Sequence, residues 1–286
     1  MRVHRNLDSL PPIPFPVVTM GSFDGVHAGH RAIIGRLRHL ACQAGGSSVL
    51  VTFHPHPRKV LYPEGAGKDL KLISTLDERC ILLEDAGLDH LVVMDFSREF
   101  AMTSPEDYVR EVLLERLKAH TIVVGFNHFF GHNKKGDFKA LYRMSRRYGF
   151  HVEEIPEQEI QHETVSSTKI RKALREGHIQ RANAYLEHQF LILATLDPYK
   201  GCFRIRISES DKLIPPEGAY AASFRIRDGY QKSLVLVADR ELLLYPLSEQ
   251  NITAGTQIAI LFQKHLANQS MGNLERGMEE VEELIF

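Results

Sequence analysis

The chain has 286 residues, with 35 basic and 36 acidic side chains and three cysteines. This length has room for two domains with separate hydrophobic cores. Because the charges nearly cancel, no overall field attracts nucleic acid or an anionic membrane, and any anion has to be bound locally. The cysteines, at positions 42, 80 and 202, form no closely spaced pair, and no stretch approaches the roughly 18 apolar residues of a membrane helix. We therefore expect a cytoplasmic protein without a nucleic-acid or membrane partner.

The first half of the chain alternates between two kinds of apolar pattern. Residues 1–16 contain four prolines and predict an entry loop. After this loop, short apolar runs predict strands and segments apolar at helical spacing predict helices. The strands are predicted at residues 17–20, 48–53, 90–94, 121–125 and 151–155, and the helices at 31–40, 76–86, 104–118 and 138–148. Such alternation predicts an α/β domain with a doubly wound parallel sheet, whose ligands bind beyond the carboxyl ends of the strands.

The pattern changes near residue 190. Short strand-like runs separated by turn residues follow, at 190–196, 202–207, 220–226, 233–237 and 257–262. They predict a small antiparallel β-barrel. An acidic segment, residues 274–284, predicts a helix that lies across this barrel. We place the two domains at residues 1–187 and 188–286.

The turn after the first predicted strand carries the most distinctive residues. Gly21 and Gly25 let the backbone approach a phosphate closely, and the following helix begins with unpaired N–H groups and a partial positive charge. His27 and His30 are three residues apart at this helix start, so both imidazoles can face one anion. The turn is therefore suited to a polyphosphate, although an ordinary turn or a metal-binding histidine pair would use the same residue types.

The order of these residues is more specific than their composition. The run Gly21-x-Phe23-Asp24-Gly25-x-His27-x-Gly29-His30 resembles the nucleotide-binding signature of the bacterial FAD synthetases, the adenylyltransferase half of the riboflavin kinase/FAD synthetase family. The final His-x-Gly-His part is shared with the wider nucleotidylyltransferase superfamily. The resemblance implies a Rossmann-like fold for the first domain.

Three further motifs extend the resemblance to roughly residues 15–187. Pro55-His56-Pro57 matches a Pro-His-Pro that borders the flavin and nucleotide pocket in that family. Asn127 and Gly131 match the loop that faces ATP or its magnesium, although His128 replaces a usual Phe and Phe129 stands where Arg is frequent. The last motif is a Ser-Thr-x-x-Arg run, Ser167, Thr168 and Arg171, which meets the nucleotide phosphates in the superfamily.

The resemblance implies an FMN adenylyltransferase, which transfers AMP from ATP to FMN with Mg²⁺ bound to the phosphates. It assigns His27, His30 and Arg171 to catalysis. It assigns substrate binding to the remaining matched residues: Gly21, Phe23, Asp24, Gly25, Gly29, Pro55, His56, Pro57, Asn127, Gly131, Ser167 and Thr168. We expect no protein-held metal, and the oligomeric state is left open.

The second domain departs from the bifunctional members of the family. Their barrel is a riboflavin kinase with a Pro-Thr-Ala-Asn motif, which occurs nowhere in this sequence, while residues 216–220 still match the family's Pro-x-Gly-x-Tyr. We therefore expect a kinase-like barrel without kinase activity. The alternatives are a bifunctional enzyme, a nucleotidylyltransferase with another small substrate, and a non-catalytic flavin or nucleotide binder. A zinc site at His27/His30, His54/His56 or His128/His132 also competes, but no cysteine or carboxylate accompanies these pairs at a favourable spacing.

Overall fold

The computed structural model describes residues 1–7, 9–126, 128–157, 159–160, 163–226, 229–239, 241–248, 252–266 and 274–284. Contacts divide the chain into two units. We call the first the sheet unit, Met1–Leu70 with Arg79–Thr164, and the second the barrel unit, Lys71–Glu78 with Val165–Phe286. Each unit is described by itself below.

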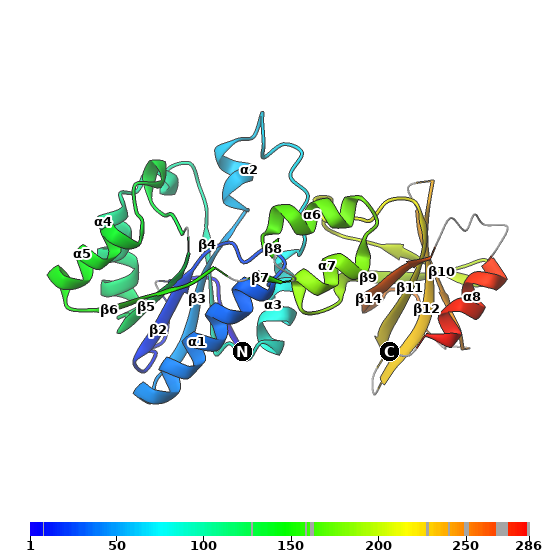
Figure 1. The fold of residues 1–286 in the computed structure, drawn as a ribbon, viewed down its shortest axis with the longest axis horizontal. Helices are drawn as coiled ribbons and strands as arrows, with labels where there is room; N and C mark the ends of the chain where they lie inside the picture. The colour runs from blue at the N-terminus through cyan, green and yellow to red at the C-terminus, as the bar shows by residue number, and fades with distance from the viewer. Residues whose placement is uncertain are drawn as a thin grey trace. The chain divides into compact units, whose positions relative to one another are not determined.

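The sheet unit contains six parallel strands in the order β1-β4-β3-β2-β5-β6 (Figure 1). Their bounds are β1 Arg2–His4, β2 Pro16–Met20, β3 Ser47–His54, β4 His90–Asp95, β5 Thr121–Gly125 and β6 His151–Ile155. A short antiparallel hairpin, β7 Glu159–Ile160 with β8 Glu163–Thr164, follows. The doubly wound α/β fold predicted from the sequence is confirmed.

The helices of this unit fall where the periodicity predicts them, with short extra turns in the loops. The longer ones are α1 Ala28–Ala44, α3 Leu76–Asp85, the π-helical segment η2 Tyr108–Arg116 and α5 Phe138–Tyr148. The short ones are α2 Pro57–Leu61, the 3₁₀ turns η1 Phe100–Met102 and η3 His132–Lys134, and α4 Pro105–Asp107, which runs directly into η2. None of the helices in the described residues is long and apolar enough to span a bilayer.

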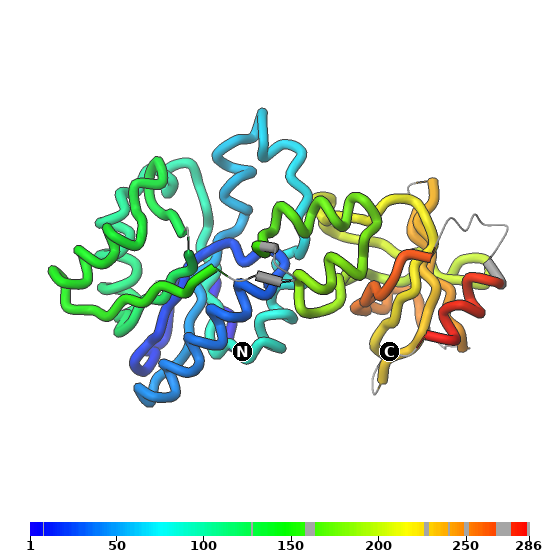
Figure 2. The backbone as a smooth tube through the Cα atoms, in the orientation of Figure 1, coloured from blue at the N-terminus to red at the C-terminus, as the bar shows by residue number. Residues whose placement is uncertain are grey.

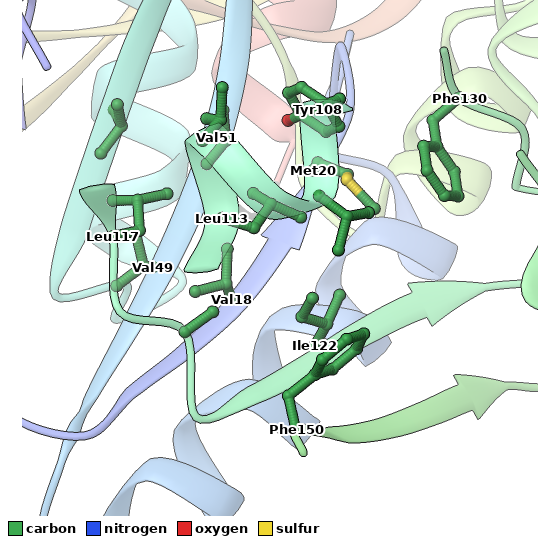
Figure 3. Close-up of a cluster of buried hydrophobic side chains, with 14 of the residues drawn as sticks. Val18, Met20, Val49, Val51, Tyr108, Leu113, Leu117, Ile122, Phe130 and Phe150 are labelled. Carbon is green, nitrogen blue, oxygen red and sulfur yellow. The ribbon is translucent and has the colours of Figure 1, made fainter. Parts of the chain in front are cut away.

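The sheet is covered on both faces, as strand periodicity requires. Val18 and Val49 pack with Leu113 of η2 and Leu141 of α5 in one buried cluster. Figure 3 shows this cluster, with strand residues from β2, β3 and β5 facing side chains of η2. Successive strand residues point to opposite faces, and α1 contacts β2, β3 and β5. A side chain at Gly125 would come within 2.9 Å of Ile33 on α1, so helix and strand pack closely there.

The first residues correct one expectation. We predicted a loop over 1–16, but β1 pairs with β4 in parallel, with Arg2 opposite His90 and His4 opposite Val92. The prolines that break regular structure begin only at Pro11. A strand of three residues has too little pattern to be seen in the sequence, because an existing sheet edge supplies its hydrogen bonds.

The barrel unit begins with two helices and closes six antiparallel strands into a barrel in the order β10-β13-β12-β11-β14-β9. Its elements are α6 Ser167–Arg175, α7 Ile179–Leu186, β9 Phe190–Tyr199, β10 Cys202–Arg206, β11 Gly218–Ile226, β12 Gly229–Ala238, β13 Glu241–Pro246, β14 Thr256–Leu266 and α8 Leu274–Glu283. The chain passes from α7 into β9 through a short connection (Figure 2). The antiparallel barrel is confirmed, with β13 as a sixth strand that the sequence analysis missed.

Helix α8 packs on the barrel as expected. It contacts β11 and β12, and Val281 is fully buried against the barrel residues. Lys264 on β14 and Glu280 on α8 form an ion pair at 3.1 Å.

One buried ion pair ties an early segment into the barrel unit. Glu78 and Lys212 lie 2.6 Å apart with no exposed side-chain surface. All three donors of the ammonium are used, because Lys212 also donates to the carbonyls of Ile73 and Leu191, each at 2.6 Å. Glu78 in turn accepts from the backbone N–H of Leu193 at 2.8 Å. This network explains why residues 71–78 group with a barrel that follows them by more than one hundred positions in the chain.

The contact division differs from the functional grouping made from the sequence. Helices α6 and α7 belong with the barrel by contacts, whereas the family motifs extend to residue 187. The functional boundary at 187/188 stays a prediction.

Candidate active site

The sheet unit has its topological switch point at β2. This strand pairs with β3 on one side and with β5 on the other, and chain order reverses between them. The pairing of β2 with β5 involves only Val17 with Thr121 and Val18 with Ile122. The two strands therefore part before their carboxyl ends, which is where doubly wound folds bind ligands.

The turn after β2 is held in a strained conformation. Phe23 and Val26 both have positive φ angles, 47° and 42°, and Gly25 has a φ of 87°. A β-branched residue rarely adopts such an angle, so the buried Val26 marks a conformation that the surroundings impose. The N–H of Val26 closes the turn on the carbonyl of Phe23 at 3.1 Å. Asp24 lies in the same turn and is 1% exposed.

The two histidines at the head of α1 stack on each other. The ring centroids of His27 and His30 are 3.7 Å apart with 16° between the planes, and Phe23 stacks on His30 at 4.3 Å. His27 precedes the helix and makes no side-chain cap, so the first N–H groups of α1 receive no hydrogen bond from it. A side chain at Gly29 would come within 3.3 Å of the His27 ring. The expectation that the two imidazoles lie together is confirmed.

The His30 ring has one buried nitrogen whose hydrogen-bonding capacity is unused in the described part of the chain. Its Nδ1 is buried and has no hydrogen-bond partner among the described residues. Burial, the neighbouring His27 and Arg79 together hold the pKa of His30 well below its usual value. The free site therefore presents a neutral imidazole, and an anion beside it would raise the pKa of the ring.

Arg79 is a site residue that the sequence analysis placed on a helix without giving it a role. Its Nη1 donates to the carbonyl of Ser22 at 2.6 Å and to the hydroxyl of Thr52 at 3.1 Å. The side chain is 2% exposed. Arg79 thus connects the start of the glycine turn to β3. Its place in a predicted helix was the only signal for it in the sequence.

A cleft opens beside this turn within the sheet unit. It has a volume of about 730 Å³ and includes Gly21 together with His56, Pro57 and Gly131 from the predicted motifs. Gly131 has a φ of 70°, and a side chain there would come within 2.7 Å of Pro105, so only glycine fits. The cleft lies at the carboxyl ends of β2, β3, β4 and β5, because its lining residues follow these strands.

The Pro-His-Pro motif forms a fixed corner of the cleft. Pro57 is the first residue of α2, and His56 precedes it as the cap, with its Nδ1 accepting from the N–H of Arg58 at 3.2 Å. Pro55 follows a cis peptide bond with His54. His56 is 7% exposed, so the ring is part of the wall.

Five aromatic rings form part of the remaining wall. They are Phe53, Phe96, Phe100, Tyr108 and Phe130, each within 5.5–6.4 Å of another in the set. The sequence analysis assigned none of them to the site. The signal was available, because residues 96–109 lie at the carboxyl end of the third predicted strand, where ligands bind in this fold.

The remaining predicted residues either belong to the barrel unit or lie outside the described residues. Asn127 lies outside the described residues. Ser167, Thr168 and Arg171 belong to α6 in the barrel unit. The cap of α6 is Ser166, whose hydroxyl accepts from the N–H of Lys169, so Ser167 and Thr168 are the first two helical residues. Arg171 is 7% exposed and its Nε donates to the carbonyl of Lys71 at 2.8 Å.

No group of three histidine, cysteine or carboxylate side chains in the described part of the chain could hold a metal ion. The rings of His27 and His30 lie face to face, whereas two ligands of one zinc ion would turn their nitrogens toward a shared point. The geometry disfavours the zinc alternative for this pair.

A doubly wound parallel sheet with a glycine turn and a helix start at its switch point defines a nucleotide-binding enzyme domain. The family model for FAD synthetase matches residues 15–169 of this chain. A bifunctional riboflavin kinase/FMN adenylyltransferase of Listeria monocytogenes is 33% identical over 222 residues, which cover 73% of this chain and 68% of that protein. The enzyme of the same name from Pseudomonas fluorescens is 34% identical over 193 residues, covering 67% and 61%. The chain belongs to the FAD synthetase family.

A solved structure extends the comparison to the whole chain. A protein of Streptococcus pneumoniae named as a macrolide-efflux protein superposes with a TM-score of 0.84, covering 99% of this chain and 97% of that one. The two sequences are 21% identical. This likeness establishes a shared fold, barrel included, and carries no information on activity.

Proposed function

We propose that the sheet unit carries out the adenylyltransferase reaction of its family at the turn after β2. The chain is an FMN adenylyltransferase, which transfers AMP from ATP to FMN and releases pyrophosphate as FAD forms. The observation that carries the assignment to this turn is the stacked His27–His30 pair at the head of α1, beside a strained glycine turn.

The chemistry needs no general base. The phosphate of FMN has a second pKa of about 6, like other phosphomonoesters, and is mostly dianionic at neutral pH. One of its oxygens attacks the α-phosphorus of ATP in line with the leaving group. A new O–P bond forms, the bond between the α-phosphorus and the bridging oxygen breaks, and pyrophosphate leaves with the electron pair. Catalysis then consists of alignment and stabilisation of developing charge.

The residues of the turn are suited to this task. We assign His27 and His30 to the α- and β-phosphates and the leaving group, and the backbone of residues 21–29 to the same anion. An incoming phosphate favours the protonated form of His30, which burial suppresses in the free site. Phe23 and Asp24 shape the turn that presents these groups.

Family resemblance supports the remaining assignments. Ser167, Thr168 and Arg171 are proposed to meet the β- and γ-phosphates, and Asn127 to face ATP or its metal. Mg²⁺ is proposed to arrive with ATP, held mainly by phosphate oxygens, where it would neutralise their charge.

The aromatic cleft is the proposed site of the flavin ring. Its aromatic rings offer flat apolar surface for a planar three-ring system, and His56, Pro57 and Gly131 also line it. Family resemblance supports Pro55 as a further residue at this border. ATP and FMN are the proposed partners, and the absence of a disulfide among Cys42, Cys80 and Cys202 supports a reducing compartment such as the cytoplasm.

Product analysis tests the assignment. Purified protein with magnesium-ATP and FMN is expected to yield FAD and pyrophosphate in equal amounts. Parallel incubations with nicotinamide mononucleotide or phosphopantetheine in place of FMN are expected to yield no adenylylated product. Absence of FAD, or adenylylation of another acceptor in its place, would refute the proposed reaction.

We further propose that the barrel has no riboflavin kinase activity. Strands β9 and β10 pair directly from Tyr199 with Cys202, leaving Lys200 and Gly201 as a two-residue turn. A turn of this length has no glycine-rich segment to surround a triphosphate. The purified protein should therefore produce no FMN from riboflavin and ATP, and production of FMN would refute this part alone.

A further inference from the structure

Two residues that line the aromatic cleft carry buried polar atoms without a partner in the described part of the chain. The hydroxyl of Tyr108 and the Nε2 of His128 are both buried, and neither has a hydrogen-bond partner among the described residues. Both residues line the cleft. Buried polar groups are nearly always hydrogen bonded in proteins, so two exceptions in one cleft call for an external partner.

The rings that carry these atoms are placed by one shared neighbour. Phe130 lies 6.3 Å from the Tyr108 ring and 6.0 Å from the His128 ring, with the latter nearly parallel at 24°. Figure 3 shows Tyr108 and Phe130 as members of the same buried cluster, so neither ring is free to turn away. The two polar atoms therefore belong to rings that lie beside the same phenylalanine in the wall of the cleft.

We propose that His128 and Tyr108 are specificity-determining residues that hydrogen bond to the polar edge of the flavin ring in this cleft. The proposal rests on the function assigned above and names the contacts that select its acceptor substrate. The isoalloxazine edge carries both acceptors and one N–H donor. A neutral imidazole nitrogen and a phenol hydroxyl match this edge, because each can donate or accept according to tautomer or rotation.

The ionisation of both groups fits this role. Burial lowers the pKa of His128 to about 4 and raises the pKa of Tyr108, so both are neutral near pH 7. Neutral groups select for the hydrogen-bonding pattern of an uncharged ring rather than for charge. The sequence supports the same reading, since His128 stands where the family resemblance leads us to expect a phenylalanine, which lacks such a nitrogen.

The test compares ring-conserving variants in the full chain. His128→Phe and Tyr108→Phe each remove one polar atom and keep a ring, and Tyr142→Phe, at a 53% exposed position outside the cleft, is the matched control. FMN binding is measured without ATP by quenching of flavin fluorescence. We expect each cleft variant to weaken binding about fivefold to tenfold, as for one lost neutral hydrogen bond, and the control to bind like the wild type.

Two FMN analogues test whether the lost affinity comes from hydrogen bonds to the edge of the flavin ring. 3-Methyl-FMN lacks the N–H donor, and 5-deaza-FMN lacks a ring acceptor. We expect at least one analogue to bind the wild-type protein more weakly than FMN does. In His128→Phe or Tyr108→Phe, the ratio of the affinities for FMN and that analogue is expected to shrink to about twofold or less, because the variant lacks the atom that recognises the missing group. His128→Gln, which offers an amide in place of the ring nitrogen, is expected to restore part of the difference.

Each outcome separates the two proposals. Wild-type affinity of both cleft variants for FMN and both analogues, in a protein that makes FAD, would overturn this inference and leave the proposed function standing. A loss of ATP binding with unchanged FMN binding would also overturn it, since the cleft would then hold adenine. A wild type that neither binds FMN nor makes FAD would overturn both.

Discussion

Two sets of buried polar groups in this molecule differ in whether their atoms have hydrogen-bond partners in the described part of the chain. In the barrel unit, Lys212 gives all three of its hydrogens to Glu78 and two carbonyls. In the sheet unit, buried ring nitrogens of His30 and His128 and the hydroxyl of Tyr108 have no partner in the described parts of the chain. The Lys212 network is complete and stabilises the fold. The unpartnered atoms of the sheet unit are instead proposed to bind substrate.

The largest expected effect comes from breaking the complete network. Lys212→Met leaves Glu78 buried and unpaired, and should cost about 3–5 kcal/mol of unfolding free energy. Lys264→Met is the matched control, because its pair with Glu280 is 3.1 Å long but more than one third exposed on both sides, and should cost about 1 kcal/mol or less. Denaturant unfolding followed by circular dichroism compares the two. Equal losses would show that the Glu78–Lys212 network is not a structural determinant.

The next effect is on turnover. His30→Ala removes a preorganised donor to the phosphates and should lower kcat for FAD formation by about 10²-fold or more, near 2.7 kcal/mol. The exposed His39 lies on the same helix, so His39→Ala is the control and should retain wild-type kcat. Steady-state assays of FAD formation give the comparison, and unchanged turnover in His30→Ala would remove this residue from the mechanism.

A smaller effect is expected from the residue that holds the turn. Arg79→Gln weakens the hydrogen bonds to Ser22 and Thr52 that position the turn after β2. We expect kcat to fall about tenfold, roughly 1.4 kcal/mol, with little change in KM for FMN, because the turn aligns phosphates rather than the ring. Arg79→Lys should recover part of the loss. A raised KM with normal kcat would place Arg79 in substrate binding.

Much of this architecture could be predicted from the sequence, and the failures share a cause. The β2 turn and its histidines were readable because strand, turn and helix signals are local. Strand β1 was missed, because its partner β4 begins at residue 90. The grouping of residues 71–78 with the barrel was also missed, because it depends on a pair 134 positions apart.

The same distinction applies within the site. His27 and His30 lie one helical turn apart, so their contact follows from spacing. The aromatic cleft instead gathers Phe53 from β3, Tyr108 from η2 and Phe130 from the loop after β5, which only the sheet topology brings together. Arg79 was visible as a helical residue, but its hydrogen bonds to Ser22 and Thr52 were not.

The last prediction concerns the pH dependence of stability. The folded-state pKa of His128, about 4, lies below the usual 6.5. The unfolded chain therefore takes up this proton first, and stability falls as pH drops from 6.5 toward 4, by at most about 1.4 kcal/mol per pH unit for one group. His128→Phe should show a shallower fall over this range in urea unfolding. An identical slope in the variant and the wild type would mean that His128 titrates normally in the folded protein.

The most direct test of whether His27 and His30 bind the phosphates of ATP is a measurement of the pKa of His30. Histidine ring resonances can be followed by NMR across pH in the free protein and with α,β-methylene-ATP bound. We predict that the pKa of His30 lies well below the usual range of histidine in the free protein and rises when the triphosphate binds, because the anion favours the charged ring. A His30 pKa that stays unchanged in the bound state would contradict the assignment of this histidine pair to the phosphates of ATP.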